Sequence, residues 1–196
     1  MISLSLIVVA YLVGSIPVGI LLARLKGKDP RKTGSGNIGA TNVMRSAGKL
    51  FGILTLFGDI LKGFVPVFIT VLLKEPDAVV ALVGLAAFVG HLFPIFLGFK
   101  GGKGVATGAG VFLAIGPLSV LFSFMVFAVV FLIWRYVSLG SLLGTISIVL
   151  FFVIFREPPA FIVLALLIGI GVYIKHSPNI RRLLSGTENK IGAPKT

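Results

Sequence analysis

The sequence has no cysteine, and among its 196 residues only two are histidine and six are acidic. Without cysteine, disulfides, thiolate metal ligands and a cysteine acyl-enzyme are all excluded. With so few histidines and carboxylates we expect no metal site, and no cofactor is implied. Extended hydrophilic stretches are also scarce, which leaves no place for a separate soluble domain.

Hydrophobic residues make up 57% of the chain and charged residues only 12%, with a mean hydropathy of +1.10. Each long apolar run predicts a membrane helix, because lipid offers no hydrogen-bond partners to backbone N–H and C=O groups. The predicted fold class is all-α, a polytopic transmembrane helical bundle. The apolar runs are roughly 1–23, 50–73, 78–99, 105–134, 136–155 and 158–174.

Two of these runs need interpretation. The run 1–23 is too long for a secretory signal and is followed by basic residues rather than a cleavage site, so we interpret it as a retained span. The run 105–134 is too long for one crossing, and Gly116-Pro117 interrupts it. We therefore divide it into a short or re-entrant helix, 105–115, and a full span, 117–134.

Charge placement orients these segments, because Lys and Arg in short loops collect on the cytoplasmic side. If 105–134 enters and leaves on one side, the basic segment 24–49 and the basic tail after 174 share the cytoplasmic face. Only Lys74 and Arg156 then face out. We predict about seven membrane helices including the short one, the N-terminus out and the C-terminus in, within a single integral membrane domain over 1–196.

The net charge of +12 calls for an anionic partner, and the candidates are membrane lipid, an anionic substrate or nucleic acid. We expect no nucleic acid, because no motif interleaves aromatic with basic residues. The simplest alternative is that the cations only orient the chain and bind anionic lipid. The loop sequences argue for more than that.

The first loop, 33–45, combines glycines with hydrogen-bond donors. Its glycines, among them Gly36, let consecutive N–H groups converge on an oxyanion, and Arg45 supplies a fork suited to phosphate. Asn37 or Asn42 could also open a short helix. The alternative is a flexible linker with capping polar residues. The uncharged side-chain donors are Ser35, Asn37, Thr41 and Asn42.

The second loop, 100–110, places glycines and Lys103 at the start of the proposed short helix. The order resembles a phosphate loop, although the Walker spacing and the Lys-Ser/Thr pair are missing, so we predict an anion site and not a nucleotide site. The helix start would direct Lys103 and the positive end of the dipole at a phosphate. The alternative, close helix packing through small residues, accounts in part for Gly108 and Gly110.

The third segment, 176–190, follows the last span. His176 and Asn179 lie three residues apart, so one helical turn could present both to the same place. An interfacial histidine that only hydrogen-bonds is an equal alternative. Glu188, a lone carboxylate among cations, is expected to lock loops together rather than to act as an acid or base. Arg182 belongs to the same basic segment.

Three polar residues within the spans complete the set. Asp59 and Lys62 are three apart and are expected to form an internal ion pair. Ser141 lies near the start of the run 136–155 and would face the same region as the loops.

The three motifs, GSGNIGATNVxR, KGGKGVATG and HxxNIxRLxxGxExK, resemble the acylphosphate:glycerol-3-phosphate acyltransferases, the PlsY family of bacterial inner membranes. The resemblance spans the whole chain. It implies transfer of a fatty acyl group from acyl phosphate to the 1-hydroxyl of glycerol 3-phosphate, giving lysophosphatidic acid and phosphate, the first step of phospholipid biosynthesis. It also implies a multi-pass inner-membrane enzyme with a cytoplasm-facing active site, and we expect a monomer.

The resemblance assigns roles to particular residues. Ser35 and Arg45 are needed for activity, His176 and Asn179 serve catalysis, and Glu188 serves integrity. We hypothesise that Arg45 and Lys103 neutralise phosphate and that His176 orients the hydroxyl; the base is either His176 or the phosphate of glycerol phosphate. The expected substrate-binding residues are Gly36, Asn37, Thr41, Asn42, Gly102, Gly104, Thr107, Gly108, Ser141, Arg182 and Glu188.

Two other functions are weighed against this one. A transporter or channel for phosphate or phosphate esters is suggested by the broken helix and the Asp59-Lys62 pair, but its sites should lie near the membrane midplane. An alcohol phosphatidyltransferase would need paired acidic motifs to hold metal, and the sequence has no aspartate cluster.

Overall fold

The computed structural model describes residues 2–191, which form helices and connecting loops with no strand among them. The side chain of Ile2 and residues 1 and 192–196 lie outside this description. The chain divides into two compact units, residues up to 115 and residues from 116 onward. The single domain over 1–196 stays a prediction.

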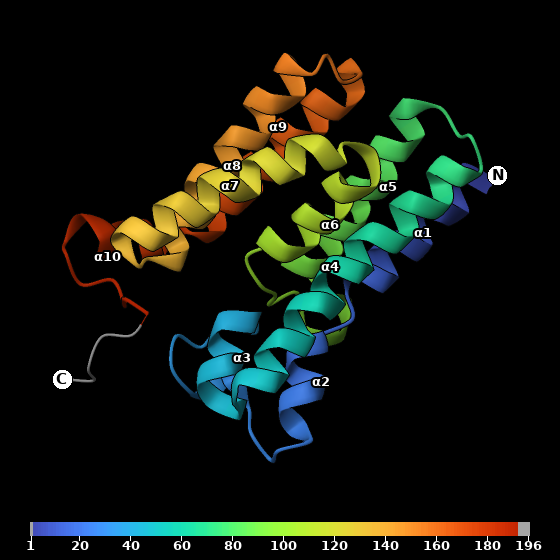
Figure 1. Cartoon of the computed structure of the whole chain (residues 1–196). Helices are drawn as coiled ribbons and strands as arrows, with labels where there is room; N and C mark the ends of the chain where they lie inside the picture. The colour runs from blue at the N-terminus through green and yellow to red at the C-terminus, as the bar shows by residue number, and fades with distance from the viewer. Residues whose placement is uncertain (1, 192–196) are drawn as a thin grey trace. The chain divides into compact units, whose positions relative to one another are not determined.

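The first unit contains three long helices and several short ones, with α2 and α3 beside the first half of α4 (Figure 1). In order they are α1 (Ile2–Gly14), α2 (Val18–Arg24), the 3-10 turn η1 (Pro30–Lys32), α3 (Ala40–Ala47), α4 (Lys49–Leu72), α5 (Asp77–Leu92), the 3-10 turn η2 (Ile95–Leu97) and α6 (Val105–Ile115).

The first apolar run is broken rather than continuous. α1 ends at Gly14 and α2 begins at Val18, with Pro17 between them. Proline lacks an N–H and cannot continue the i to i−4 ladder, so the helix stops there. The two pieces together still have the length and hydropathy of one candidate span, Ser3–Arg24.

Glycines bring the helices of the first unit into close contact. A Cβ on Gly63 of α4 would overlap the carbonyl of Thr107 in α6, and a Cβ on Gly110 would overlap the carbonyl of Ile60. In membranes such small residues permit close backbone approach and favour van der Waals packing. The expectation that Gly110 serves helix packing is therefore confirmed.

The second unit consists of α7 (Pro117–Trp134), α8 (Val137–Ile154), α9 (Pro159–Lys175) and α10 (Ser177–Leu184). α8 packs between α7 and α9, and α10 turns away from α9 by 61°. The predicted break at Gly116-Pro117 is confirmed, because α6 ends at Ile115 and α7 begins at Pro117.

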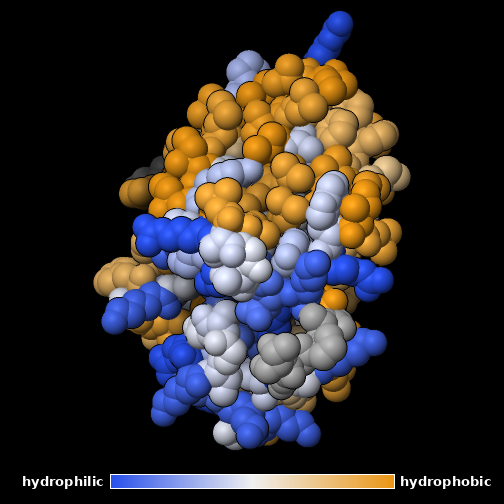
Figure 2. Space-filling model, turned by 90° about the vertical axis from the view of Figure 1, so that its left-hand side faces the viewer, coloured by the Kyte–Doolittle hydropathy of each residue, from blue (hydrophilic) through white to orange (hydrophobic). Residues whose placement is uncertain are grey.

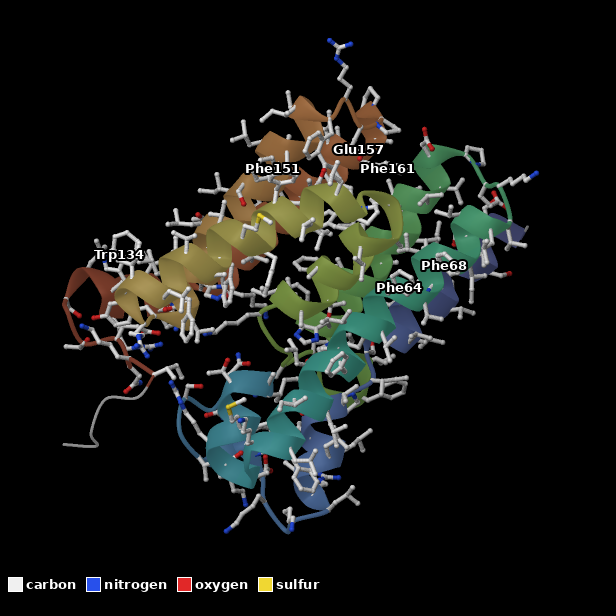
Figure 3. The ribbon with its side chains drawn as sticks, viewed as in Figure 1. Phe64, Phe68, Trp134, Phe151, Glu157 and Phe161 are labelled. Carbon is white, nitrogen blue, oxygen red and sulfur yellow. The ribbon has the colours of Figure 1, made fainter. Side chains whose placement is uncertain are left out.

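The second unit has two distinct ends, one at each end of α8. Trp134, just before α8, and Glu157, just after it, lie at opposite ends of the unit (Figure 3). The chain returns to the Trp134 end, since the N–H of Ile191 donates to the carbonyl of Arg135 at 3.0 Å. At the other end, burial raises the pKa of the Glu157 carboxyl above its ordinary value.

The surface is that of a membrane protein. Hydrophobic side chains make up much of the face seen in Figure 2, and large ones are exposed along several helices, as at Leu132 and Ile170. On α4, Phe64 and Phe68 stack with ring centroids 5.1 Å apart (Figure 3). Lipid can solvate such residues, whereas water cannot do so without cost.

Within residues 2–191, five helical segments are long and apolar enough to cross a membrane, six if the bent α9–α10 pair counts as one. The short apolar helix α6 adds to them. The all-α membrane bundle with about seven membrane helices is confirmed. The orientation of the termini stays a prediction, and Lys195 of the basic tail lies outside the described residues.

Candidate functional site

Asn42 organises the first loop from within. Its side chain is buried, with 3% of its surface exposed. Nδ2 donates to the carbonyl oxygens of Pro30, Thr33 and Asn37 at 2.7, 3.0 and 2.8 Å, and Oδ1 accepts from the N–H of Ser35 at 2.9 Å. One amide thus fixes four points of the loop backbone, and this loop is not a flexible linker.

The short helix after this loop begins differently from the expectation. α3 starts at Ala40 and its N-cap residue is Gly39, so the prediction that Asn37 or Asn42 opens it is wrong. Asn37 instead accepts the N–H of Gly39 through Oδ1 at 2.8 Å. An asparagine side chain that accepts the N–H two residues later forms an Asx turn. Asn37 therefore shapes the turn that leads into α3 and does not cap the helix itself.

Several groups that suit phosphate binding remain accessible on this scaffold. Ser35, Gly36 and Arg45 are exposed, while Thr41 is half-buried. Thr41 and Arg45 are four residues apart on α3, so they lie on the same face of that helix. Gly34 and Gly36 have φ of 59° and 70°, a left-handed conformation that suits glycine.

The second loop is anchored to the end of α5. The N–H groups of Gly101 and Gly102 donate to the carbonyls of Leu92 and His91, at 3.2 and 3.1 Å. A Cβ on Gly102 would overlap the His91 ring, and one on Gly104, where φ is 85°, would overlap Phe88. These glycines are therefore required by close packing, whatever else they bind.

Lys103 lies between two buried glycines and is itself half-buried. The predicted helix start after the loop is confirmed, since α6 begins at Val105 and the N–H of Gly108 donates to the carbonyl of Gly104 at 2.7 Å. Thr107 is completely buried, and its hydroxyl has no hydrogen-bond partner within the described part of the chain.

The expected ion pair of Asp59 and Lys62 is confirmed. Nζ of Lys62 lies 2.8 Å from Oδ1 of Asp59, and both side chains are about 5% exposed. Lys62 also donates to the carbonyl of Ile16 at 2.9 Å, in the break between α1 and α2. His91, which the sequence analysis did not select, lies with Nδ1 3.7 Å from the same Asp59 oxygen.

In the second unit, His176 and Asn179 lie at the turn between α9 and α10. Both are buried, with 3% and 5% exposed. Nδ1 of His176 lies 2.8 Å from the carbonyl oxygen of Val172. A carbonyl only accepts, so Nδ1 carries the hydrogen and Nε2 is the nitrogen that can take up a proton.

Glu188 joins three segments of the second unit. Oε1 accepts from Ser138 Oγ at 2.9 Å and from Asn179 Nδ2 at 2.7 Å, and Oε2 accepts from Arg182 Nε at 2.6 Å. Burial opposes ionisation of Glu188, but these three donors outweigh it and lower the pKa of the carboxyl. The expectation that Glu188 locks loops together is confirmed.

Ser141 lies one turn beyond Ser138 on α8 and is buried, with 6% exposed. Its carbonyl accepts from the hydroxyl of Thr145 at 2.7 Å. In the second unit the structure brings Asn179, Arg182 and Glu188 into contact beside Ser138, one turn from Ser141 on α8; in the first unit each glycine loop is held by its own contacts. The roles of these residues in substrate binding stay predictions.

Two polar residues were missed by the sequence analysis. Ser138 has no distinguishing signal, because a serine at a helix start is common. His91 had one: an ionisable residue inside an apolar run is costly and needs a partner, and that rule identified Asp59 but was not applied to His91.

The helices and their surface define an integral membrane protein with polar residues in two glycine loops, in one buried turn and in the buried Asp59–Lys62–His91 cluster. Residues 4–186 match the family described as glycerol-3-phosphate acyltransferase. A glycerol-3-phosphate acyltransferase of Geobacter sulfurreducens is 54% identical over 190 residues, covering 97% of this chain and 98% of the relative. One from Aquifex aeolicus is 48% identical over 190 residues, covering 96% and 99%.

Two solved structures are also similar. The crystal structure of PlsY, an integral membrane glycerol 3-phosphate acyltransferase, in its glycerol 3-phosphate form has a TM-score of 0.95 at 48% identity, covering 98% of this chain and 96% of the other. Its lysophosphatidic acid form has a TM-score of 0.93 at 47% identity, with the same coverage. The chain belongs to the glycerol-3-phosphate acyltransferase family.

Proposed function

We propose that this protein transfers a fatty acyl group from acyl phosphate to the 1-hydroxyl of glycerol 3-phosphate, forming lysophosphatidic acid and releasing phosphate. One observation supports glycerol 3-phosphate as the acceptor. The chain shares its fold and 48% of its residues with PlsY, an acyltransferase whose structure was solved in a glycerol 3-phosphate form. The donor rests on the chemistry of the residues themselves.

The chain has no cysteine that could carry an acyl group, so a direct transfer suits it. Acyl phosphate is a mixed anhydride and is already activated. The alcohol oxygen attacks the carbonyl carbon, the bond from that carbon to the phosphate oxygen breaks, and phosphate leaves with the electron pair. The protein needs to orient the alcohol and to stabilise the developing negative charge.

The first unit supplies groups for anions. Arg45 and Lys103 neutralise phosphate, and the exposed Ser35 donates from a loop that Asn42 keeps rigid. Gly36, Asn37 and Thr41 complete this set in our proposal, together with the second loop at Gly102, Gly104 and Gly108, whose lack of side chains lets a phosphate approach the backbone closely. A scaffold fixed before the substrate binds avoids the entropic cost of ordering it later.

The second unit supplies groups for proton transfer and orientation. His176 has Nε2 as its accepting nitrogen, because Nδ1 is bound to Val172. The hydroxyl proton passes either to that nitrogen or to the phosphate of glycerol 3-phosphate, whose second pKa near 6 makes it a usable base. Asn179 and Ser141 donate hydrogen bonds, and Glu188 holds Asn179 in place.

The acyl chain remains in an apolar environment throughout, where each buried methylene contributes roughly 0.8 kcal/mol. We propose that the protein works as a monomer in the bacterial inner membrane with its polar loops toward the cytoplasm. There the net charge of +12 attracts both anionic substrates and the anionic lipid surface.

The test is to incubate the purified protein with glycerol 3-phosphate and one donor at a time: acyl phosphate, acyl-CoA or acyl carrier protein. We expect lysophosphatidic acid with acyl phosphate only. Turnover with the thioesters alone would overturn the assignment of acyl phosphate as the donor. Uptake of labelled glycerol phosphate into liposomes without product would favour the transporter instead.

A further inference from the structure

Three ionisable residues lie inside the first unit and are not used by the proposed reaction. Asp59, Lys62 and His91 have 3%, 6% and 4% of their surface exposed. Burying charged groups in a membrane segment is costly, and apolar residues of similar size would pack there as well or better. Their presence therefore points to a task that an apolar cluster would not perform.

The cluster connects separate parts of the unit. Lys62 pairs with Asp59 at 2.8 Å and donates to the carbonyl of Ile16 at 2.9 Å, so the carboxylate is fixed against the α1–α2 break. The same Asp59 oxygen lies 3.7 Å from Nδ1 of His91 at the end of α5. The orientation of the imidazole ring thus depends on a charge that is itself held in place.

The opposite edge of the His91 ring faces the second loop. A Cβ on Gly102 would overlap Nε2 first, and then Cε1 and Cδ2 of this ring. The carbonyl of His91 also accepts the N–H of Gly102 at 3.1 Å. His91 therefore constrains Gly102 in two ways: its carbonyl accepts the Gly102 N–H, and its ring leaves no room for a side chain at that position.

We propose that His91 is a positioning residue for the second glycine loop: its ring, oriented by Asp59 and Lys62, sets the backbone of Gly102 and so places Lys103 for the phosphate of the acceptor substrate. This inference rests on the proposed function for its effect on turnover. Lys103 follows Gly102 directly, so a shift of the glycine moves the lysine with it. A misplacement of about 1 Å can cost on the order of a hundredfold in rate.

The kinetic test uses His91→Ala, Gly102→Ala and the double variant, with Thr70→Ala as control. Thr70 lies on α4, is completely buried and donates only along its own helix, to the carbonyl of Pro66 at 2.8 Å. We expect His91→Ala and Gly102→Ala each to raise KM for glycerol 3-phosphate about tenfold or more, with KM for acyl phosphate near the wild-type value. In the control, both KM values should stay near wild type.

The double variant tests whether the ring and the glycine act through one contact. Removing the ring makes room for the new methyl group, so the combined loss in kcat/KM should be clearly smaller than the product of the single losses. Losses that multiply, or a His91→Ala enzyme with unchanged KM for glycerol 3-phosphate, would overturn the proposal. If His91→Ala does not fold, His91→Asn, which keeps a polar group toward Asp59 but lacks the ring, replaces it under the same criteria.

A second measurement does not depend on activity. Because the chain has no cysteine, Lys100→Cys gives one site for a nitroxide spin label on the exposed side of the loop, two residues before Gly102. We expect the label to become more mobile in the His91→Ala background and to be unchanged with Thr70→Ala. Unchanged mobility in His91→Ala contradicts the positioning role, even in an active enzyme. If the wild-type protein shows no turnover, greater mobility in His91→Ala still supports the positioning role, and the missing turnover counts against the proposed reaction alone.

Discussion

The side chain of Asn42 holds the backbone of Ser35: Oδ1 accepts the Ser35 N–H at 2.9 Å, while Nδ2 of the same amide donates to three carbonyls of the loop. The exposed serine is thus placed by a buried residue seven positions further along the chain. Replacing Asn42 should therefore affect both stability and catalysis.

Asn42→Asp tests this scaffold. An aspartate offers no N–H to the carbonyls of Pro30, Thr33 and Asn37, and each buried acceptor left without a donor costs roughly 1–3 kcal/mol. We expect the free energy of unfolding to fall by about 2–4 kcal/mol and the turnover to fall more than tenfold. Thermal unfolding and kcat measure these. Ser46→Ala on the same helix, which loses one hydrogen bond of 3.3 Å, should change neither by much.

Arg45→Lys tests the phosphate fork. Lysine keeps the charge but loses the planar pair of donors that binds phosphate in two places. Because Arg45 is exposed, stability should stay within about 0.5 kcal/mol, while KM for glycerol 3-phosphate rises about tenfold. Steady-state kinetics give the KM. A parallel Lys49→Ala variant, also exposed, shows how far the KM depends on nearby positive charge alone. An unchanged KM in Arg45→Lys would remove the fork from the mechanism.

His176→Ala decides which group takes the hydroxyl proton. If Nε2 of His176 is the base, kcat should fall by about 10²–10⁴ and lose the pH dependence that belongs to an imidazole. The pH profile of kcat measures this. A variant that keeps most of its kcat and a normal profile would assign the proton to the phosphate of glycerol 3-phosphate.

Glu188→Gln tests the clamp on Asn179 and has a defined pH dependence. The folded pKa of Glu188 lies below its ordinary value of 4.5, so its contribution to stability is complete above pH 4.5 and is lost as the pH falls through the folded pKa. Near neutral pH we expect the variant to be less stable by roughly 1–2 kcal/mol, because glutamine carries no charge and has only one oxygen to accept from the donors Asn179, Arg182 and Ser138.

The stability difference between wild type and Glu188→Gln should shrink as the pH is lowered from 4.5, and thermal unfolding measures it. Asp29, whose pKa the Arg31 side chain lowers to about 2, titrates identically in both proteins and cancels in the difference. Ser185→Ala, an exposed change in the same segment, serves as control. A difference that does not vary with pH would contradict the clamp.

Asp59→Asn tests the buried pair. The change leaves the Lys62 ammonium buried without its counter-charge, which typically costs 3–5 kcal/mol. Thermal unfolding in detergent should show this loss, whereas Asp59→Asn combined with Lys62→Met should recover much of it. A double variant no more stable than the single one would show that the pair is not an independent unit.

The sequence determined the membrane class and the helices, because the length and hydropathy of each apolar run are local properties. The break at Gly116-Pro117 and the start of α6 at Val105 were predictable for the same reason. The break at Pro17 carried the same signal but was not predicted, since the run 1–23 was taken as one span.

Only the tertiary structure decided which polar residues hold the loops and which remain exposed. Asn42 and Ser35 look alike as donors in the sequence, yet one is buried as a scaffold and the other is exposed. His91 meets Gly102 and Asp59 only because α5, the second loop and α4 pack together. Hydropathy is a sum over neighbouring residues, whereas a buried hydrogen bond depends on atoms brought together from distant parts of the chain.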